Sequence, residues 1–254
     1  MRKTLIQVTA VVAFFALWKL YVTGFNVSSL VLPPPEAIAV ALVELFASGE
    51  IWFHLYTTLI ECLGGFVIAC VVGMTLGLLL GRIEILDTIF KPFVIALQVT
   101  PKVALIPLFI LWFGFGIESK IIVSAVLAFF PVFANSYLGA RSVDRGLLEL
   151  FDVGKSGHLR RFRILVFPSA MPYILTGMEM AIVLSIIGAV VAEFVAGSRG
   201  LGYLATIKLQ ELEVDTLFAV VVVLALIGFL LYFLVGSLRR FVIPWHESAS
   251  RATI

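Results

Sequence analysis

The chain has 254 residues, of which 61% are hydrophobic and 13% are charged, and its formal net charge is +2. A soluble domain has roughly 45–50% apolar and about 25% charged residues, so this composition excludes a water-soluble globular protein. An integral membrane protein remains, because several stretches reach the ~20 apolar residues that cross a bilayer.

Six stretches are long and apolar enough to be predicted as membrane spans. The first has the basic start of a signal peptide, but its apolar run is too long and no small-residue cleavage site follows. We therefore predict an all-α membrane protein whose first transmembrane helix lies in residues 1–24. The predicted spans are at about 5–24, 59–81, 88–115, 119–139, 172–196 and 215–237.

The third predicted span is broken. Pro92, Pro101 and Pro107 all lie within 88–115, and each removes a backbone donor. At membrane depth, neighbouring helices or an aqueous cavity must compensate for the hydrogen bonds that are lost.

The segment 25–58 is predicted to be extracytoplasmic and to contain an interfacial helix. Three prolines end the first span, and the last of them, Pro35, can begin a helix with Glu36 in its first turn. The apolar run that follows is too short to cross the bilayer, so this helix should lie in the interface or pack on the bundle. The transmembrane core is predicted at 59–245 and a cytoplasmic tail at 246–254.

The positive charges give an orientation. The segment 140–171 and both termini carry most of the lysines and arginines, whereas the segments predicted to lie outside carry only Arg199 and Lys208. Six spans place both termini and 140–171 on one side, which the positive-inside rule identifies as the cytoplasm.

A stripe of small residues runs along the second predicted span. Its members recur every four residues and therefore share one helix face, which lets another backbone approach closely in lipid. The stripe predicts either a buried contact within one chain or a face at a subunit interface. It consists of Gly65, Ala69, Gly73, Gly77 and Gly81.

The cytoplasmic segment 140–171 contains Gly154-Lys155-Ser156, which matches only the end of a nucleotide-binding P-loop. Seven residues separate Gly154 from the preceding Gly146, where four are required, and no strand comes before. We also find no catalytic constellation and no metal-binding spacing. The sequence therefore predicts a pore or carrier with no catalytic, cofactor or metal site.

The same segment carries apolar residues at about helical spacing, which a solvated loop does not need. Such residues indicate short helices that dock on a partner. They are Leu147, Leu148, Leu150, Phe151, Leu159, Phe162, Ile164 and Leu165.

This segment resembles the coupling region of permease subunits of bacterial ABC importers, of the nitrate, sulfonate and taurine branch. Gly154 and Pro168 take the places of the family's glycine and proline, although their separation is one residue longer and Leu148–Leu150 replaces the usual EAA. Motifs similar to the family's own extend over about residues 30–245. They lie at 32–35, 54–59, 64–69, 101–116, 168–172, 174–177, 192–194 and 200–203.

The resemblance implies a type I importer permease fold and a particular set of partners. These are a second copy of the permease, two ATPase subunits that hold ATP and magnesium, an extracytoplasmic substrate-binding protein and membrane lipid, with no nucleic acid. It implies that the cytoplasmic loop docks into an ATPase subunit, with Gly154 as a turn, Leu159 and Phe162 as docking anchors, and the arginines as polar contacts or lipid-headgroup partners. The predicted coupling residues are Leu150, Asp152, Gly154, Leu159, Arg160, Arg161, Phe162 and Pro168.

Two ionisable residues are pathway candidates, because such residues within a membrane usually face protein or water. Lys102 can serve an anion pathway or form a structural ion pair. Glu193 can cap the glycine turn at 197–202 or contact the binding protein.

The expected substrate is a small anion such as a sulfonate, taurine, nitrate or bicarbonate. A thiamine precursor, riboflavin or an aromatic carboxylate is the alternative within the same architecture. A secondary transporter is the alternative of another class, but it would require inverted repeats, and only one span is visibly broken.

Overall fold

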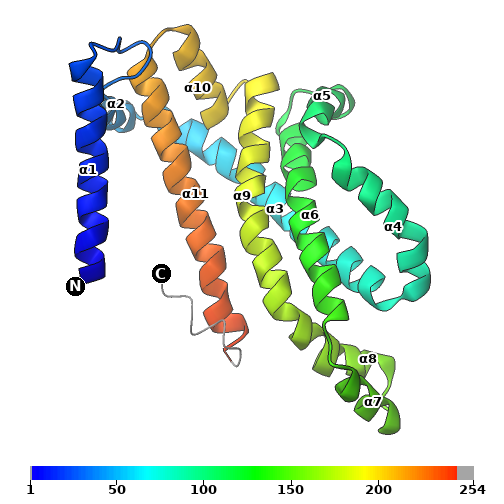
Figure 1. Ribbon diagram of the computed structural model, residues 1–254. Helices are drawn as coiled ribbons and strands as arrows, with labels where there is room; N and C mark the ends of the chain where they lie inside the picture. Colours follow the sequence, from blue (N-terminus) through cyan, green and yellow to red (C-terminus); the bar gives the residue numbers. More distant parts are fainter. Residues whose placement is uncertain (1, 245–254) are drawn as a thin grey trace. The chain divides into compact units, whose positions relative to one another are not determined.

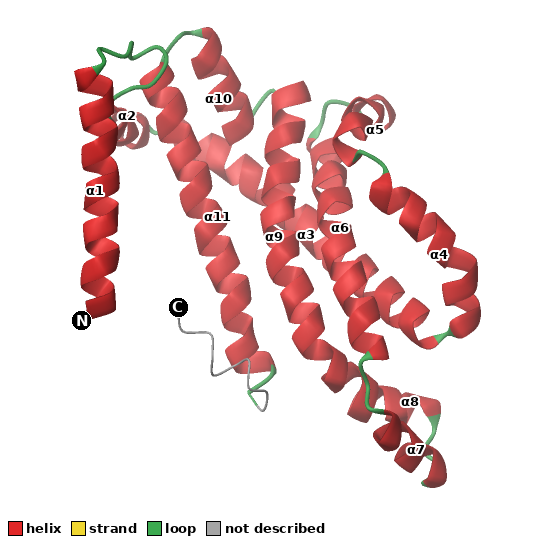
Figure 2. Ribbon diagram, in the orientation of Figure 1, coloured by secondary structure: helices red, strands yellow, loops and turns green. Residues whose placement is uncertain are grey.

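The computed structural model describes residues 2–244, so the predicted tail at 246–254 lies outside the described residues. Within that range the chain is helical and has no strand, which confirms the all-α prediction (Figure 2). The helices are α1 (Arg2–Gly24), α2 (Pro35–Ser48), α3 (Glu50–Arg82), α4 (Glu84–Val99), η1 (Lys102–Leu105), α5 (Ile106–Phe113), α6 (Ile117–Arg141), α7 (Arg145–Val153), α8 (His158–Arg161), η2 (Phe162–Val166), α9 (Phe167–Ala196), α10 (Leu201–Gln210) and α11 (Val214–Val242).

Five stretches among the described residues are long and apolar enough to cross a membrane, and a sixth results if one bent pair counts as a single span. The bent pair is Glu84–Val99 with Lys102–Phe113, which meet at 86°. Pro101 lies at the break, while Pro107 lies in the first turn of α5, where its missing N–H has no intrahelical partner to lose. The prolines therefore account for both the end of α4 and the start of α5.

The chain divides into two compact units. One comprises Met1–Thr57 with Gly197–Leu226, and the other comprises Thr58–Ala196 with Ile227–Ile254. The long helices α3 and α11 each begin in the first unit and continue into the second.

In the first unit, α2 begins at Pro35 and carries Glu36 in its first turn. The Glu36 carboxylate lies 2.9 Å from the ammonium of Lys19 on α1, and this hydrogen bond lowers the pKa of Glu36 below its ordinary value. In the same unit, His54 Nδ1 accepts a hydrogen bond of 3.1 Å from the Gly200 N–H. Gly200 has a φ of +107°, which favours glycine at this position.

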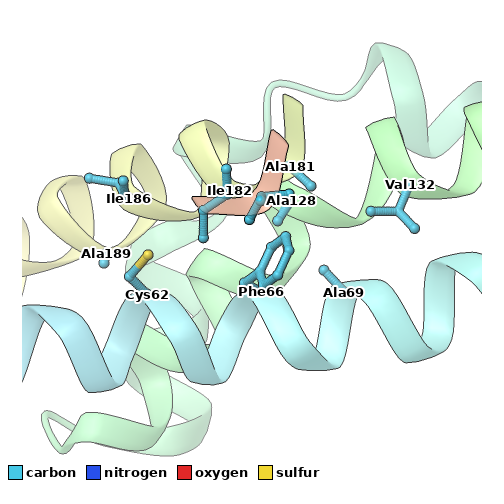
Figure 3. Packing of buried hydrophobic residues seen from close by; sticks show 10 residues of the cluster. Cys62, Phe66, Ala69, Ala128, Val132, Ala181, Ile182, Ile186 and Ala189 are labelled. Atoms are coloured by element: carbon cyan, nitrogen blue, oxygen red, sulfur yellow. The ribbon is translucent and has the colours of Figure 1, made fainter. Parts of the chain in front are cut away.

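The core of the second unit is built where α3, α6 and α9 meet. Cys62, Phe66 and Ala69 of α3 pack against Ala128 of α6 and Ile182 of α9 (Figure 3). The alanines keep the helices close and the larger side chains fill the remaining space. The α6 and α9 helices run side by side along this core (Figure 1).

The small-residue stripe of α3 faces α6. A Cβ added at Gly77 would lie 2.6 Å from the Phe133 carbonyl oxygen, and one added at Gly81 would lie 2.7 Å from Ala140 Cβ. A Cβ at Gly65 would overlap the Ser124 hydroxyl. The sequence predicted either a buried contact within one chain or a face at a subunit interface. In the structure the stripe packs against α6 of the same chain.

A polar junction joins the same three helices in the core. The Ser185 hydroxyl donates to the Cys62 carbonyl at 2.6 Å, and the Ser124 hydroxyl donates to the Ser185 carbonyl at 2.8 Å. Buried hydroxyls need such partners, particularly where no water is available. The junction therefore fixes the register of α3, α6 and α9.

Candidate functional site

The cytoplasmic loop predicted at 140–171 folds into short helices at one end of α6 and α9 (Figure 1). Asp144 caps the first of them, α7, because its carboxylate accepts a 3.0 Å hydrogen bond from the Leu147 N–H. After α8, a π-helical turn runs directly into α9. The loop is thus continuous with a membrane-spanning helix.

Helix α7 has apolar residues on two faces. Leu148 and Phe151 pack on a small cluster of Val143, Leu165 and Val166, which holds the helix to the bundle.

The other apolar face of α7 lies in the open. Leu147, Leu150 and Val153 are 45%, 64% and 83% exposed, and they follow one another at intervals of three residues. Leu159 of α8 is 64% exposed as well. We call Leu147, Leu150, Val153 and Leu159 the exposed apolar patch.

The turn between α7 and α8 differs from the prediction in one detail. Gly154 ends α7 with a φ of −71°, a value that any residue adopts, whereas Lys155 has a φ of 48°. The left-handed position is therefore held by Lys155, and the glycine is not required by its backbone angle. Space is the tighter constraint, since a Cβ at Gly154 would lie 3.3 Å from the Leu150 carbonyl oxygen.

The predicted coupling residues separate into two groups. Arg161 turns back to α7, where its Nη1 donates to Asp152 Oδ1 at 2.6 Å. Phe162 is half-buried, and its ring lies 6.0 Å from that of Phe167. Asp152, Arg161 and Phe162 thus make contacts within the loop and with the start of α9. Phe162 is therefore not an exposed docking anchor, although the sequence predicted it to be one.

The other predicted coupling residues lie at the surface or at the start of α9. Leu159 and Arg160 are exposed, as is Arg163, while Pro168 is half-buried in the first turn of α9. The exposed residues leave an apolar patch beside basic side chains.

Lys102 lies in a groove between η1 and α6. Its Nζ donates to the Gln98 carbonyl at 3.1 Å and sits 4.2 Å from the centre of the Phe130 ring. It forms no ion pair within residues 2–244, so the structural ion pair predicted as one alternative is not present there. The groove has a volume of about 370 Å³.

Glu193 is buried, with 1% of its surface exposed, and accepts a 2.7 Å hydrogen bond from the Thr58 hydroxyl. This burial leaves the carboxylate no surface for contact with a soluble binding protein. The capping role at 197–202 stays a prediction.

Sequence reasoning missed Lys120. This lysine is 2% exposed, and its Nζ donates to the Phe115 and Gly116 carbonyls at 2.9 and 3.0 Å. It holds the glycine-containing loop between α5 and α6. The available signal was a lysine within the first turn of an apolar span, four residues after Gly116.

Comparisons with known proteins agree with this arrangement. Residues 65–245 match the family model described as "Binding-protein-dependent transport system inner membrane component". The riboflavin transport system permease protein RibX of Chloroflexus aurantiacus is 34% identical over 91% of this chain and 86% of its own. The putative aliphatic sulfonates transport permease protein SsuC of Bacillus subtilis is 34% identical over 92% and 84%.

Two further comparisons extend the relationship. The taurine transport system permease protein TauC of Escherichia coli is 27% identical over 96% of this chain and 91% of its own. A solved structure described as "Crystal structure of an amino acid ABC transporter with histidines" has a TM-score of 0.56 over 84% of this chain and 96% of its own. That structure is 18% identical and shares the fold.

The family match and the apolar helices make this a multi-pass protein of the inner membrane, and they confirm the predicted resemblance. The chain belongs to the family of inner-membrane components of binding-protein-dependent transport systems, as a permease subunit of an ABC importer for a small solute.

Proposed function

We propose that this permease forms the translocation pathway for a small anionic solute such as a sulfonate, taurine, nitrate or bicarbonate. Relatives named for aliphatic sulfonates and for taurine support this class, and Lys102 supplies a positive charge at the groove. Riboflavin or a thiamine precursor is the second candidate, because relatives are named for riboflavin and formylaminopyrimidine.

The observation that carries the transport mechanism is the exposed apolar patch on α7 and α8. A patch of this kind in water favours a docking partner. We expect that partner to be an ATPase subunit, which would hold ATP and magnesium and perform hydrolysis in place of this chain. Two permeases, two ATPase subunits and one binding protein would make up the importer.

The mechanism follows from the continuity of the loop with α9. When ATP closes the ATPase pair, α7 and α8 would move with it as a docked body, and the movement would reach the membrane through η2 and α9. Such a transition is a rigid-body switch between two states. Arg160 and Arg163 are free to contact the ATPase or lipid headgroups, whereas Arg161 holds Asp152.

The test is purification of the tagged permease from its native membranes in mild detergent, with identification of the proteins that accompany it. The parent chain should bring an ATPase subunit in about 1:1 ratio, and Leu159→Asp should lose it, because a charge would enter the apolar contact. Leu30→Asp, the same change at an exposed leucine in the segment predicted to be extracytoplasmic, is the matched control.

A permease that purifies alone and transports after reconstitution would overturn the importer mechanism in favour of a secondary transporter. If Leu159→Asp recovered as much ATPase as Leu30→Asp and the parent chain, the docking surface would instead lie elsewhere on the chain.

A further inference from the structure

The groove at Lys102 is one of two neighbouring cavities between α4 and α6. The larger, of about 370 Å³, is lined chiefly by apolar side chains from α3, α4, α5 and α6. The smaller, of about 280 Å³, continues along α4 past Gln98 and Lys91 to Asp87 and Tyr137. Both cavities are lined by Phe130, which therefore lies at their junction.

Lys102 is the charged residue that lines the larger cavity, among side chains such as Val72, Leu105 and Phe129. An ammonium has three N–H donors, and the structure uses one of them, to the Gln98 carbonyl. The Phe130 ring beneath it supplies a second, weaker attraction. A positive charge in apolar surroundings without a carboxylate is suited to attract an anion.

The size and lining of the cavity indicate the class of ligand. Sites for small molecules have roughly 300–1,000 Å³ and combine apolar walls with a few polar groups that fix orientation. A cavity of about 370 Å³ with one ammonium has that composition. Its ligand would have an apolar body and a single negative group.

We propose that this cavity is a transit site for a small organic anion with an apolar body, and that Lys102 recognises the anionic group. The proposal rests on the function proposed above and narrows its substrate class. On binding, a sulfonate or carboxylate accepts charge-assisted hydrogen bonds from the Lys102 ammonium. These bonds are stronger than the cation–π contact between Lys102 and Phe130, so they replace it. Release of the ring opens the junction to the second cavity, where Lys91 is the next positive charge.

The test measures equilibrium binding of radiolabelled hexanesulfonate to the purified permease, with its co-purifying subunits, in phosphatidylcholine nanodiscs. No extracytoplasmic binding protein is added, and hexyltrimethylammonium serves as the probe with the same body and the opposite charge. The parent should bind hexanesulfonate saturably and should bind the cation at least tenfold more weakly.

Four variants test whether the binding occurs at this site. Lys102→Met should weaken hexanesulfonate binding about tenfold or more, since a hydrogen-bonded charge is lost, while Lys102→Arg should stay within about threefold of the parent. Lys19→Met, a matched change on α1 outside the groove, should bind as the parent does. Phe130→Leu keeps the wall apolar but frees the ammonium, so it should bind at least as tightly as the parent.

The proposal is overturned by equal binding in Lys102→Met and the parent, by equal affinity for the two probes, or by absence of saturable binding in the parent. Weaker binding in Phe130→Leu would overturn the role of that ring at the junction. The importer assignment is read separately, from the ATPase subunit in the same preparation, so its failure cannot be confused with failure of this site.

Discussion

Arg239 and Glu179 form a largely buried ion pair between α11 and α9. Arg239 of α11 places its Nε 2.7 Å from Glu179 Oε1, and its Nη2 donates to the Thr176 hydroxyl at 2.7 Å. The side chains of Arg239 and Glu179 are each 16% exposed. Removal of one member of a largely buried pair leaves the other charge without its partner, which costs more than the pair itself contributes.

We therefore expect Arg239→Gln to lower the free energy of unfolding in detergent by about 2–4 kcal/mol, because the Glu179 carboxylate loses its ion-pair partner at a largely buried position. Thermal unfolding followed by circular dichroism measures this loss. The double variant Glu179→Gln/Arg239→Gln should recover at least half of it. A loss in the double variant as large as in the single one would mean that the arginine acts through packing alone.

The glycine stripe gives a second prediction, with neighbouring residues as test and control. Gly65→Ala would place a methyl group against Ser124 and the Ala125 backbone, whereas a methyl group at Gly64 would meet Ile121 at an ordinary 3.4 Å. Overpacking of this kind costs about 1–3 kcal/mol, so Gly65→Ala should reduce thermal stability while Gly64→Ala should not. Equal stability of the two variants would contradict the close approach of α3 to α6.

At the scale of elements, much of the pattern could be predicted from local chemistry. Pro101 and Pro107 predicted the break in the third span, and Pro35 predicted the start of α2, because a proline restricts its own backbone wherever the chain goes. The apolar spacing likewise predicted short helices in the cytoplasmic loop.

The orientation of side chains on those short helices could not be predicted. Leu159 and Phe162 have the same spacing signal, yet Leu159 is exposed and Phe162 packs inward on Phe167. A helix of four residues presents no repeat long enough to identify a buried face, and the π-helical turn that follows shifts the phase. Packing against α7 and α9 decides which residue faces outward.

The pairing of Asp152 with Arg161 gives a prediction about the loop as a unit. Asp152 is 62% exposed, so the pair adds less than about 1 kcal/mol to stability, but it sets the position of α8 against α7. Arg161→Asp should lower ATPase recovery in the purification by up to about fivefold, the equivalent of 1 kcal/mol. The exchanged pair Asp152→Arg/Arg161→Asp should restore it, and recovery as low as in the single variant would exclude the ion pair as the cause.

At the scale of the whole molecule, composition established the membrane and the motifs established the family, because both are properties of the sequence in every environment. The division into two units was not predicted. It cuts α3 after Thr57, close to the predicted start of the core at residue 59, but it also cuts α11 after Leu226, where a continuous apolar helix gives no boundary signal. The cavities beside α4 were missed for a related reason, since the 86° bend that creates them depends on tertiary packing.

The bent pair also decides how many times the chain crosses the membrane. If Glu84–Val99 and Lys102–Phe113 form one span, three spans separate Leu30 from Val153; if they form a re-entrant loop, only two do. Leu30 and Val153 therefore lie on opposite sides in the first case and on the same side in the second. In both cases α9 alone separates Val153 from Leu209, which lies on α10.

Single cysteines at these exposed positions can be labelled with a membrane-impermeant maleimide. Leu30→Cys and Leu209→Cys should react in intact cells, as six spans with cytoplasmic termini require. Val153→Cys should react only after permeabilisation under conditions that also release the ATPase subunit proposed to cover it. The parent chain controls for Cys62, which is 1% exposed, and for half-buried Cys70. If Leu30→Cys, like Val153→Cys, reacted only after permeabilisation, the bent pair would be a re-entrant loop. The N-terminus would then lie outside the cell.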